Sequence, residues 1–315
     1  MSTLALRGPY WVTVRQYRRT LWLTGALVLA ALAVIGGLRI WDLQYPDVYV
    51  GDGYQHVADN NSGYKLLREA IKQFSHAMLL LPLLIGALVA GPLTAREFES
   101  GTYKLSLTQS IGPAHWLRAK LLTAVAAALA TTLVLTAAYR IGWPRVAGTY
   151  RLHWADPGPY MSIGTVLFAY ALLAVTVGVL VGQLIHRTLA AMAVTGGVVG
   201  VIMLVLGAFR WDLLPVRTLT GPARADASPL GMPGNGLFID QGLVATSGKQ
   251  LSGWSCYADG QSTGCRSDVD IASQYLTYQP RSHFWPTQLI ETGIVLALAA
   301  LAAYAAFRLL RARHP

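Results

Sequence analysis

The sequence predicts an all-α integral membrane protein with six transmembrane helices, cytoplasmic N- and C-termini and a large outer segment between helices 5 and 6. Charged residues make up only 13% of the chain, about half of the roughly 25% that is typical of soluble domains. Apolar residues make up 54%, and they gather into long uninterrupted blocks. A third observation, the placement of Lys and Arg along the chain, sets the predicted orientation.

Six uncharged apolar blocks are long enough to cross the ~30 Å hydrocarbon core of a bilayer as helices. They lie at about 21–38, 77–95, 121–139, 160–185, 188–209 and 292–307. The first block exceeds the ~7–15 apolar residues of a secretory signal, and Gly36-Gly37-Leu38-Arg39 is a poor cleavage site. We therefore expect the first block to be an uncleaved anchor.

Basic residues favour one orientation, because Lys and Arg close to membrane spans stay on the cytoplasmic side. With the N-terminus inside, the cytoplasmic segments hold only two acids, Glu97 and Glu99. They hold these basic residues: Arg7, Arg15, Arg18, Arg19, Arg96, Lys104, Arg118, Lys120, Arg187, Arg308, Arg311 and Arg313. The net charge of +10 is thus concentrated in strips beside the spans, where anionic lipid headgroups, not nucleic acid, are the expected partner.

The parts of the chain before and after the large outer segment form separate predicted regions. Residues 1–20 place aromatics beside arginines, which favours a cytoplasmic interfacial helix, although plain topogenic charge explains them equally well. Residues 21–209 hold helices 1–5, and apolar residues at helical spacing over 64–74 predict a short amphipathic helix leading into the second span. The last region, 289–315, is helix 6 with a basic cytoplasmic tail.

The extracytoplasmic segment 210–288 is rich in Gly, Pro, Ser and Asp and contains both cysteines of the chain. An oxidising compartment would allow Cys256 and Cys265 to form a disulfide. Free thiols or a metal pair are the alternatives, but no neighbouring His pattern supports a metal site, so we expect none.

A polar segment between the second and third spans carries the most functional information. It reads Arg96-Glu97-Phe98-Glu99-Ser100-Gly101-Thr102-Tyr103-Lys104-Leu105-Ser106-Leu107-Thr108-Gln109-Ser110. Gly101 permits a tight turn or a helix end, and Thr102 can cap the stretch after it. One interpretation is that these residues merely end the second span and keep the loop soluble. The other is that they form a cytoplasmic docking element.

The second interpretation gains weight from a resemblance. Arg-Glu-x-Glu-x-Gly-Thr in this position resembles the coupling region of the ABC type-2 exporter permeases. The chain is also similar to the subset common in high-GC Gram-positive bacteria, and the matching positions are Arg15-Gln16, Thr108-Gln109-Ser110, Trp116, Lys120, Gln279-Pro280, Phe284-Trp285-Pro286, Gln288 and Glu291. It differs at 111–115, Ile-Gly-Pro-Ala-His, where family members usually carry an Arg-rich turn.

The resemblance implies a permease subunit of an ATP-binding cassette exporter in a bacterial cell membrane. The coupling segment, 96–116, would dock a separate nucleotide-binding ATPase through Arg96, Glu97, Glu99, Gly101 and Thr102. ATP and Mg would be bound by that partner, and a second permease copy or paralogue would complete the pathway. This chain needs no cofactor of its own.

The sequence itself supports a separate motor. The nearest approach to a phosphate-binding P-loop, Gly242 to Gly248-Lys249-Gln250, has the wrong spacing and lacks the hydroxyl residue. No predicted span carries a nucleophile with a base, so we do not expect catalysis within the chain. Spans rich in Ala, Leu, Val and Gly suit an apolar or amphipathic cargo. The alternative function is a non-transporting membrane anchor or sensor that binds through its outer segment.

One acid is predicted to lie within a span. Glu291 sits about one turn inside helix 6, and Gln288 lies one turn away. Placing an acid in the membrane costs free energy, so such a residue suggests a function, and gating is the role we consider. A local structural role near a helix N-terminus, where the helix dipole favours an acid, is the stronger alternative.

Overall fold

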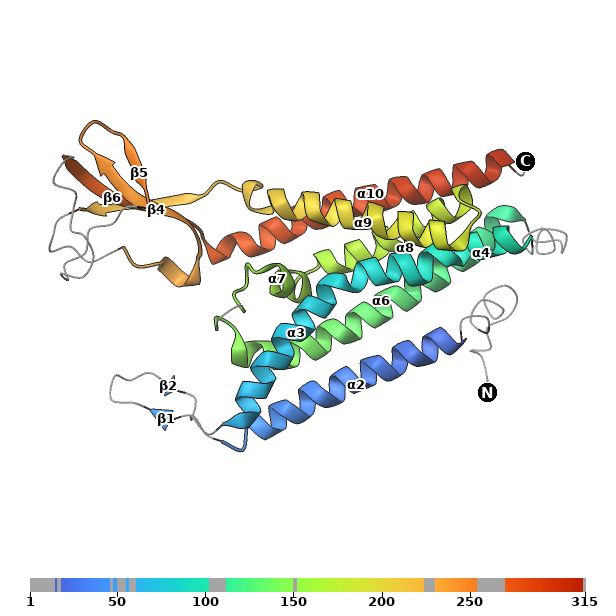
Figure 1. Ribbon diagram of the computed structural model, residues 1–315, viewed down its shortest axis with the longest axis horizontal. Coiled ribbons are helices and arrows are strands. Elements are labelled where there is room, and N and C mark those ends of the chain that lie inside the picture. The colour runs from blue at the N-terminus through green and yellow to red at the C-terminus, as the bar shows by residue number, and fades with distance from the viewer. Residues whose placement is uncertain are drawn as a thin grey trace. The chain divides into compact units, whose positions relative to one another are not determined.

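A computed structural model describes residues 15, 18–45, 48–49, 55–56, 61–101, 112–149, 152–223, 230–253 and 270–313. The chain divides into two compact units (Figure 1). The first comprises Met1–Gly207 with Glu291–Pro315, and the second is Ala208–Ile290. Cys256, Cys265 and Thr102 lie outside the described residues, so the disulfide and the Thr102 cap stay predictions.

The described part of the chain has six helices that are long and apolar enough to span a membrane, as predicted. The second of them is built from three consecutive elements: α3, a π-helix η1 and α4. The bounds of the helices are α2 (Arg18–Asp42), α3 (Ser62–Leu84), η1 (Ile85–Ala90), α4 (Gly91–Ser100), α6 (Pro113–Val146), α7 (Pro157–Ile163), α8 (Val166–Leu184), α9 (Thr188–Phe209) and α10 (Phe284–Arg313). A two-stranded ribbon pairs β1 (Val48–Tyr49) with β2 (Gln55–His56).

Two predicted boundaries change. The fourth span, expected over 160–185, begins later, at Val166, because Gly164 adopts an extended conformation and separates the short helix α7 from the span α8. The amphipathic helix expected over 64–74 is continuous with the second span, since α3 runs without a break from Ser62 to Leu84. Its buried residues Leu67, Ile71 and Met78 recur at helical spacing along one face of α3.

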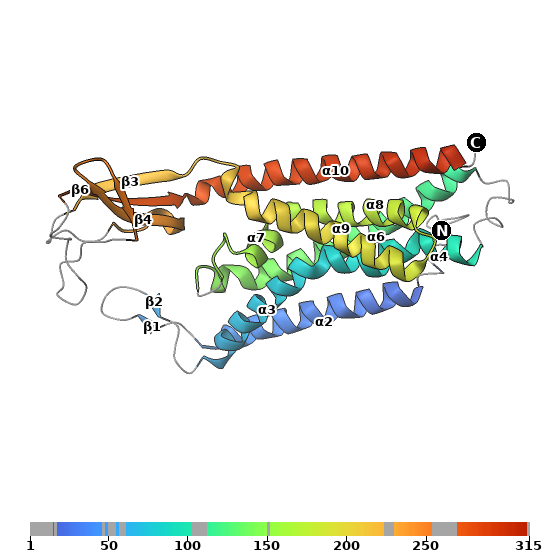
Figure 2. The ribbon, with the colours of Figure 1, turned by 45° about the horizontal axis from the view of Figure 1, so that its top comes forward.

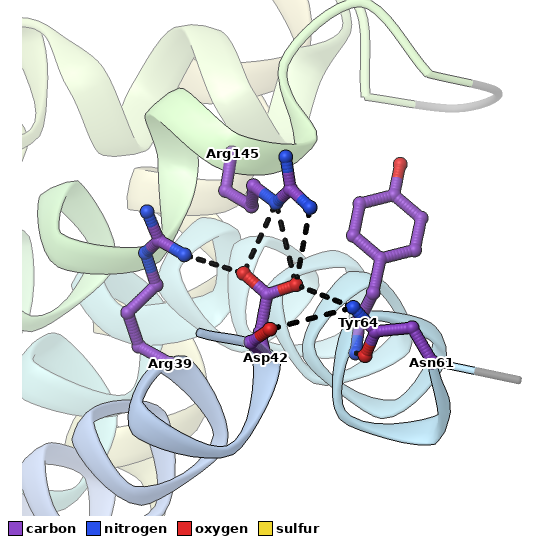
Figure 3. Close-up of polar contacts among 5 residues, drawn as sticks. All are labelled: Arg39, Asp42, Asn61, Tyr64 and Arg145. Carbon is purple, nitrogen blue, oxygen red and sulfur yellow. Dashed lines mark hydrogen bonds and ion pairs between the residues drawn. The ribbon is translucent and has the colours of Figure 1, made fainter. Parts of the chain in front are cut away.

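One end of the first unit is held by an ion cluster around Asp42 (Figure 3). Asp42, the last residue of α2, is buried and accepts hydrogen bonds from Arg39, from Arg145 of α6 at 3.0 and 3.3 Å, and from the Asn61 amide at 3.1 Å. Asn61 in turn caps α3 by accepting from the Tyr64 backbone N–H. Three spans that are distant in sequence are therefore fixed by one carboxylate.

Helix α8 is the most buried span of the described chain: 83% of the residues in its 18-residue apolar stretch are buried. Its course among the other helices is shown in Figure 2. Helix α8 contacts η1 and α4 very closely, because Gly178 and Gly182 leave no side chain in the way. A Cβ on Gly178 would lie 2.4 Å from the Ala90 Cβ, and one on Gly182 would lie 2.2 Å from the Thr94 hydroxyl oxygen. Small residues permit this close approach of helices in membranes, where packing is a main driving force.

The second unit contains a four-stranded antiparallel sheet in the order β3-β6-β4-β5, so the purely α-helical class predicted for the chain needs correction. The strands are β3 (Arg217–Pro222), β4 (Leu237–Ala245), β5 (Gln250–Ser252) and β6 (Ile271–Gln279). Three short 3₁₀ turns accompany them: η2 (Arg210–Asp212), η3 (Pro233–Asn235) and η4 (Arg281–His283). Leu243, Tyr275 and Leu276 are buried within this unit.

A polar contact links three strands of this sheet. The Asp240 carboxylate on β4 accepts hydrogen bonds from the Ser252 hydroxyl at 2.6 Å and the Tyr275 hydroxyl at 2.8 Å. These donors favour the ionised form, so they lower the pKa of Asp240, with the Ser252 bond as the larger cause. Burial raises the pKa of Tyr275, and the hydrogen bond to Asp240 raises it further.

The close contact at Gly178 predicts an unusual response to alanine. In an ordinary helix interior, Gly→Ala stabilises by about 1 kcal/mol, whereas Gly178→Ala forces its methyl group into Ala90 and should destabilise by about 1–3 kcal/mol. Gly197→Ala in α9 is the control, because a Cβ there meets nothing within 4 Å. Apparent Tm in detergent should fall for the first variant only. An equal or higher Tm for Gly178→Ala would contradict the packing.

Candidate coupling site

The polar segment identified in the sequence begins at the end of α4. The helix ends at Ser100, and Gly101 adopts a left-handed conformation with φ 73° while its N–H donates to the Phe98 carbonyl at 3.3 Å. Glycine adopts this conformation without strain. The helix therefore ends where the sequence predicts a helix end.

Glu97 forms a buried ion pair within the chain. The Lys120 ammonium on α6 donates to one Glu97 carboxylate oxygen and, at 3.3 Å, to the Leu93 carbonyl. The Lys120 side chain is 5% exposed and that of Glu97 is 12% exposed. Lys120 also lies 5.0 Å from the ring centre of Trp116, a cation–π contact. The second Glu97 oxygen is buried and has no hydrogen-bond partner among the described residues.

Glu99 contacts the beginning of α9. Its carboxylate accepts from the Thr188 backbone N–H at 2.9 Å and from the Thr188 hydroxyl. An acid at a helix N-terminus satisfies an otherwise unpaired N–H and interacts favourably with the helix dipole. The contact thus ties the last turn of α4 to the first turn of α9.

Phe98 occupies the space between these two contacts. Its ring meets Trp116 edge-to-face, with centroids 6.4 Å apart, and stacks on His186 at 5.2 Å. His186 belongs to the tight turn between α8 and α9, and the Arg313 guanidinium lies 3.3 Å from its ring nitrogen. Arg313 also donates to the Gln183 carbonyl at 2.7 Å. We call Glu97, Phe98, Glu99, Trp116, Lys120, His186 and Thr188 the α4-end cluster.

The structure brings two of the predicted partner-binding residues, Glu97 and Glu99, into contacts inside the chain. Arg96 is exposed at the surface of α4, and Gly101 forms the helix end. Phe98 and Trp116 lie in the predicted coupling segment 96–116, and Lys120 matches the family resemblance, but none of the three was predicted as a binding residue, and Thr188 was not predicted to belong to the site. The position of Lys120 directly before the apolar part of the third span was the available signal, because a charge there requires a partner.

The acid predicted within the sixth span also has a partner in the structure. Glu291 is 1% exposed, and the Tyr170 hydroxyl of α8 donates to its carboxylate at 2.8 Å. Near the start of α8, the Thr165 hydroxyl lies 3.0 Å from that of Thr292. Gln288 is buried as well. Tyr170 was not predicted, since nothing in its sequence position distinguishes it from a packing residue.

The sequence matches the family described as ABC-2 membrane transporter related over residues 23–210, more than half of the 315 residues. The chain belongs to this family. The match begins in α2 and ends at the start of η2, so it covers the whole α4-end cluster and leaves β3–β6 and α10 outside. No curated protein and no solved structure matches the chain.

Membership of the ABC-2 family identifies the chain as a multi-pass membrane permease of ABC-2 type. It agrees with the resemblance drawn from Arg96 to Thr102, which lie within the match, whereas the blocks near both ends of the chain lie outside 23–210. Membership of this family implies an ATP-binding partner subunit.

The buried ion pair of the α4-end cluster predicts an asymmetric mutational response. Lys120→Met leaves the Glu97 carboxylate buried without a counter-charge, which should cost about 3–5 kcal/mol. Replacing both groups, in Glu97→Gln with Lys120→Met, should recover most of that loss, because no charge is then left alone. Apparent Tm of the purified permease is the measurement. If Lys120→Met alone is as stable as the unmodified chain, the ion pair between Glu97 and Lys120 is absent.

Proposed function

We propose that this ABC-2 permease exports an apolar or amphipathic compound, and that a separate ATPase subunit drives it by docking on the segment 96–116. The observation that supports this most is the α4-end cluster. It links α4 to α6 through Glu97 and Lys120, and to α9 through Glu99 and Thr188. A force applied to the segment immediately after α4 would therefore reach several spans at once.

Packing inside the bundle extends this linkage to α8. The Thr94 hydroxyl of α4 donates to the Val179 carbonyl of α8 at 3.3 Å, next to the close contacts at Gly178 and Gly182. Interiors packed this tightly move as bodies and do not deform continuously. The end of α4 has the properties of a lever, because it is rigid and connected to three other spans.

The acids of the segment also have contacts inside the chain. Glu97 and Glu99, which were expected to meet basic groups on the motor protein, contact Lys120 and Thr188 of neighbouring spans. Changing either acid would disturb the permease itself, so neither tests docking cleanly. Arg96 is a better probe, since it is exposed and belongs to the same motif.

Charge supports a cytoplasmic location for this end of the bundle. The described side chains that are both exposed and charged near it are mainly basic: Arg96, Arg118, Arg187, Arg308, Arg311 and Arg313. Such an excess marks the cytoplasmic side. Both termini and the α4 end would then face the ATPase, while the sheet of the second unit would lie outside the cell.

Side-specific labelling tests this orientation. In a chain with Cys256 and Cys265 replaced by serine, Ser100→Cys at the exposed end of α4 should react with a membrane-impermeant maleimide only after the cells are opened. A cysteine at Ser252, on β5 of the second unit, should react in intact cells and serves as the control. Labelling of Ser100→Cys in intact cells would refute both the orientation and the docking proposal.

Charge reversal of Arg96 tests docking. Arg96→Glu places a negative charge where we expect an acidic group of the ATPase, so recovery of that subunit with the permease from native membranes should fall at least about tenfold. Arg68→Glu is the matched control, because Arg68 is equally exposed near the start of α3, at the opposite end of the bundle. Quantitative mass spectrometry of the affinity-purified complex is the readout. Equal recovery for both variants would argue against this docking surface and favour the anchor or sensor alternative.

A further inference from the structure

Three spans of the first unit line an apolar groove that the coupling function does not use. Its walls come from the first turns of α2, from the junction of α3 with η1, and from the middle of α6. The volume is about 350 Å³, and the lining is aliphatic apart from Thr24 and Thr131. An apolar cavity excludes water and accepts apolar molecules. The groove is thus suited to a hydrocarbon ligand.

The groove lies beside the part of α2 that is farther from the ion cluster. Near the ion cluster, Asp42 is buried, and Ile35 packs in a core with Leu67, Ile71 and Tyr139. Toward the other end, Leu23 and Leu27 are 73% and 63% exposed although they face the groove. Small residues of α6, including Ala124, Ala127 and Ala128, deepen the hollow opposite them.

Two apolar occupants compete for the groove: a helix of a second copy and a lipid chain. A single acyl chain is narrower than a helix, which is about 10 Å across, and it can lie along the groove. Bilayer hydrocarbon is also the apolar material that surrounds these helices. We therefore take a lipid chain as the occupant, and a helix of another copy is one outcome of the test.

Basic residues at the same end of α2 indicate the kind of headgroup. Arg18 is the first residue of α2, shortly before Leu23, and both Arg18 and the preceding Arg15 are exposed. Arg or Lys close to a span attracts anionic lipids, by about a fivefold gain in affinity for each residue. We propose that the groove binds one acyl chain of an anionic phospholipid whose headgroup lies beside Arg15 and Arg18.

Lipid binding to the purified permease tests the chain site and the headgroup site separately. Native mass spectrometry would follow titration with phosphatidylglycerol and with phosphatidylcholine of identical acyl chains. Ala127→Trp fills the groove and should weaken binding of both lipids at least about tenfold. Ala126→Trp, on the neighbouring exposed position of α6 outside the groove, should leave binding unchanged.

A second set of variants tests the contribution of the two arginines to headgroup binding. Arg15→Gln with Arg18→Gln should weaken phosphatidylglycerol binding by roughly twenty-five-fold, from about fivefold for each Arg, and leave phosphatidylcholine unchanged. Arg308→Gln with Arg311→Gln, two exposed residues near the end of α10, removes the same charge elsewhere; as the control it should weaken phosphatidylglycerol binding much less and leave phosphatidylcholine unchanged. If Ala127→Trp fails to fold, Thr24→Trp fills the same groove from the α2 wall.

Two outcomes would overturn the proposal. Equal lipid binding by Ala127→Trp and Ala126→Trp would show that the groove is not the site. A change from dimer to monomer in Ala127→Trp, with unchanged lipid binding, would show that a second copy occupies it. Neither result bears on the docking of the ATPase, which is measured without lipid titration at Arg96.

Discussion

The structure of this permease depends on one constraint, namely that ionised groups close to the bilayer interior are satisfied inside the chain. An unpaired charge there costs several kcal/mol, and water is not available to lower that cost. Asp42 is surrounded by donors from three spans, and Glu97 is held by Lys120. The two arrangements lie at opposite ends of the bundle. Each converts a costly group into a cross-link between helices, and together they decide which spans move together.

The same constraint changes the interpretation of the family motif. A Glu-x-Glu pattern on a cytoplasmic segment suggests two charges directed at a partner, but Glu97 and Glu99 both contact other helices of the permease. Buried ion pairs contribute little net stability, because desolvation offsets most of the attraction. Their contribution is geometric. They hold the end of α4 in one position relative to α6 and α9, which is a requirement for transmitting a displacement.

The sequence was sufficient for the spans and insufficient for the contacts between them. Long apolar blocks identify membrane helices whatever packs around them, so all six were predicted. Glu97 and Lys120 are 23 positions apart, and Asp42 and Arg145 are 103 apart, so no local pattern pairs them. The strands were missed for another reason. Gly, Pro, Ser and Asp dominate the composition of 210–288, whereas β4 and β6 are short stretches with Ile, Leu, Tyr and Thr that favour strands.

These cross-links lie at the two ends of the first unit and join different sets of helices. At its coupling end, α4 is joined to α6, α8 and α9 through Lys120, Val179 and Thr188, three links that do not involve α2. At the other end, Asp42 joins α2 to α3 and α6. A displacement of α4 would then carry its neighbours as a body while α2 pivots about Asp42. The groove lies between α2 and that body, so its width would change with the movement. An acyl chain in the groove would therefore oppose closure and favour the conformation in which α2 stands apart.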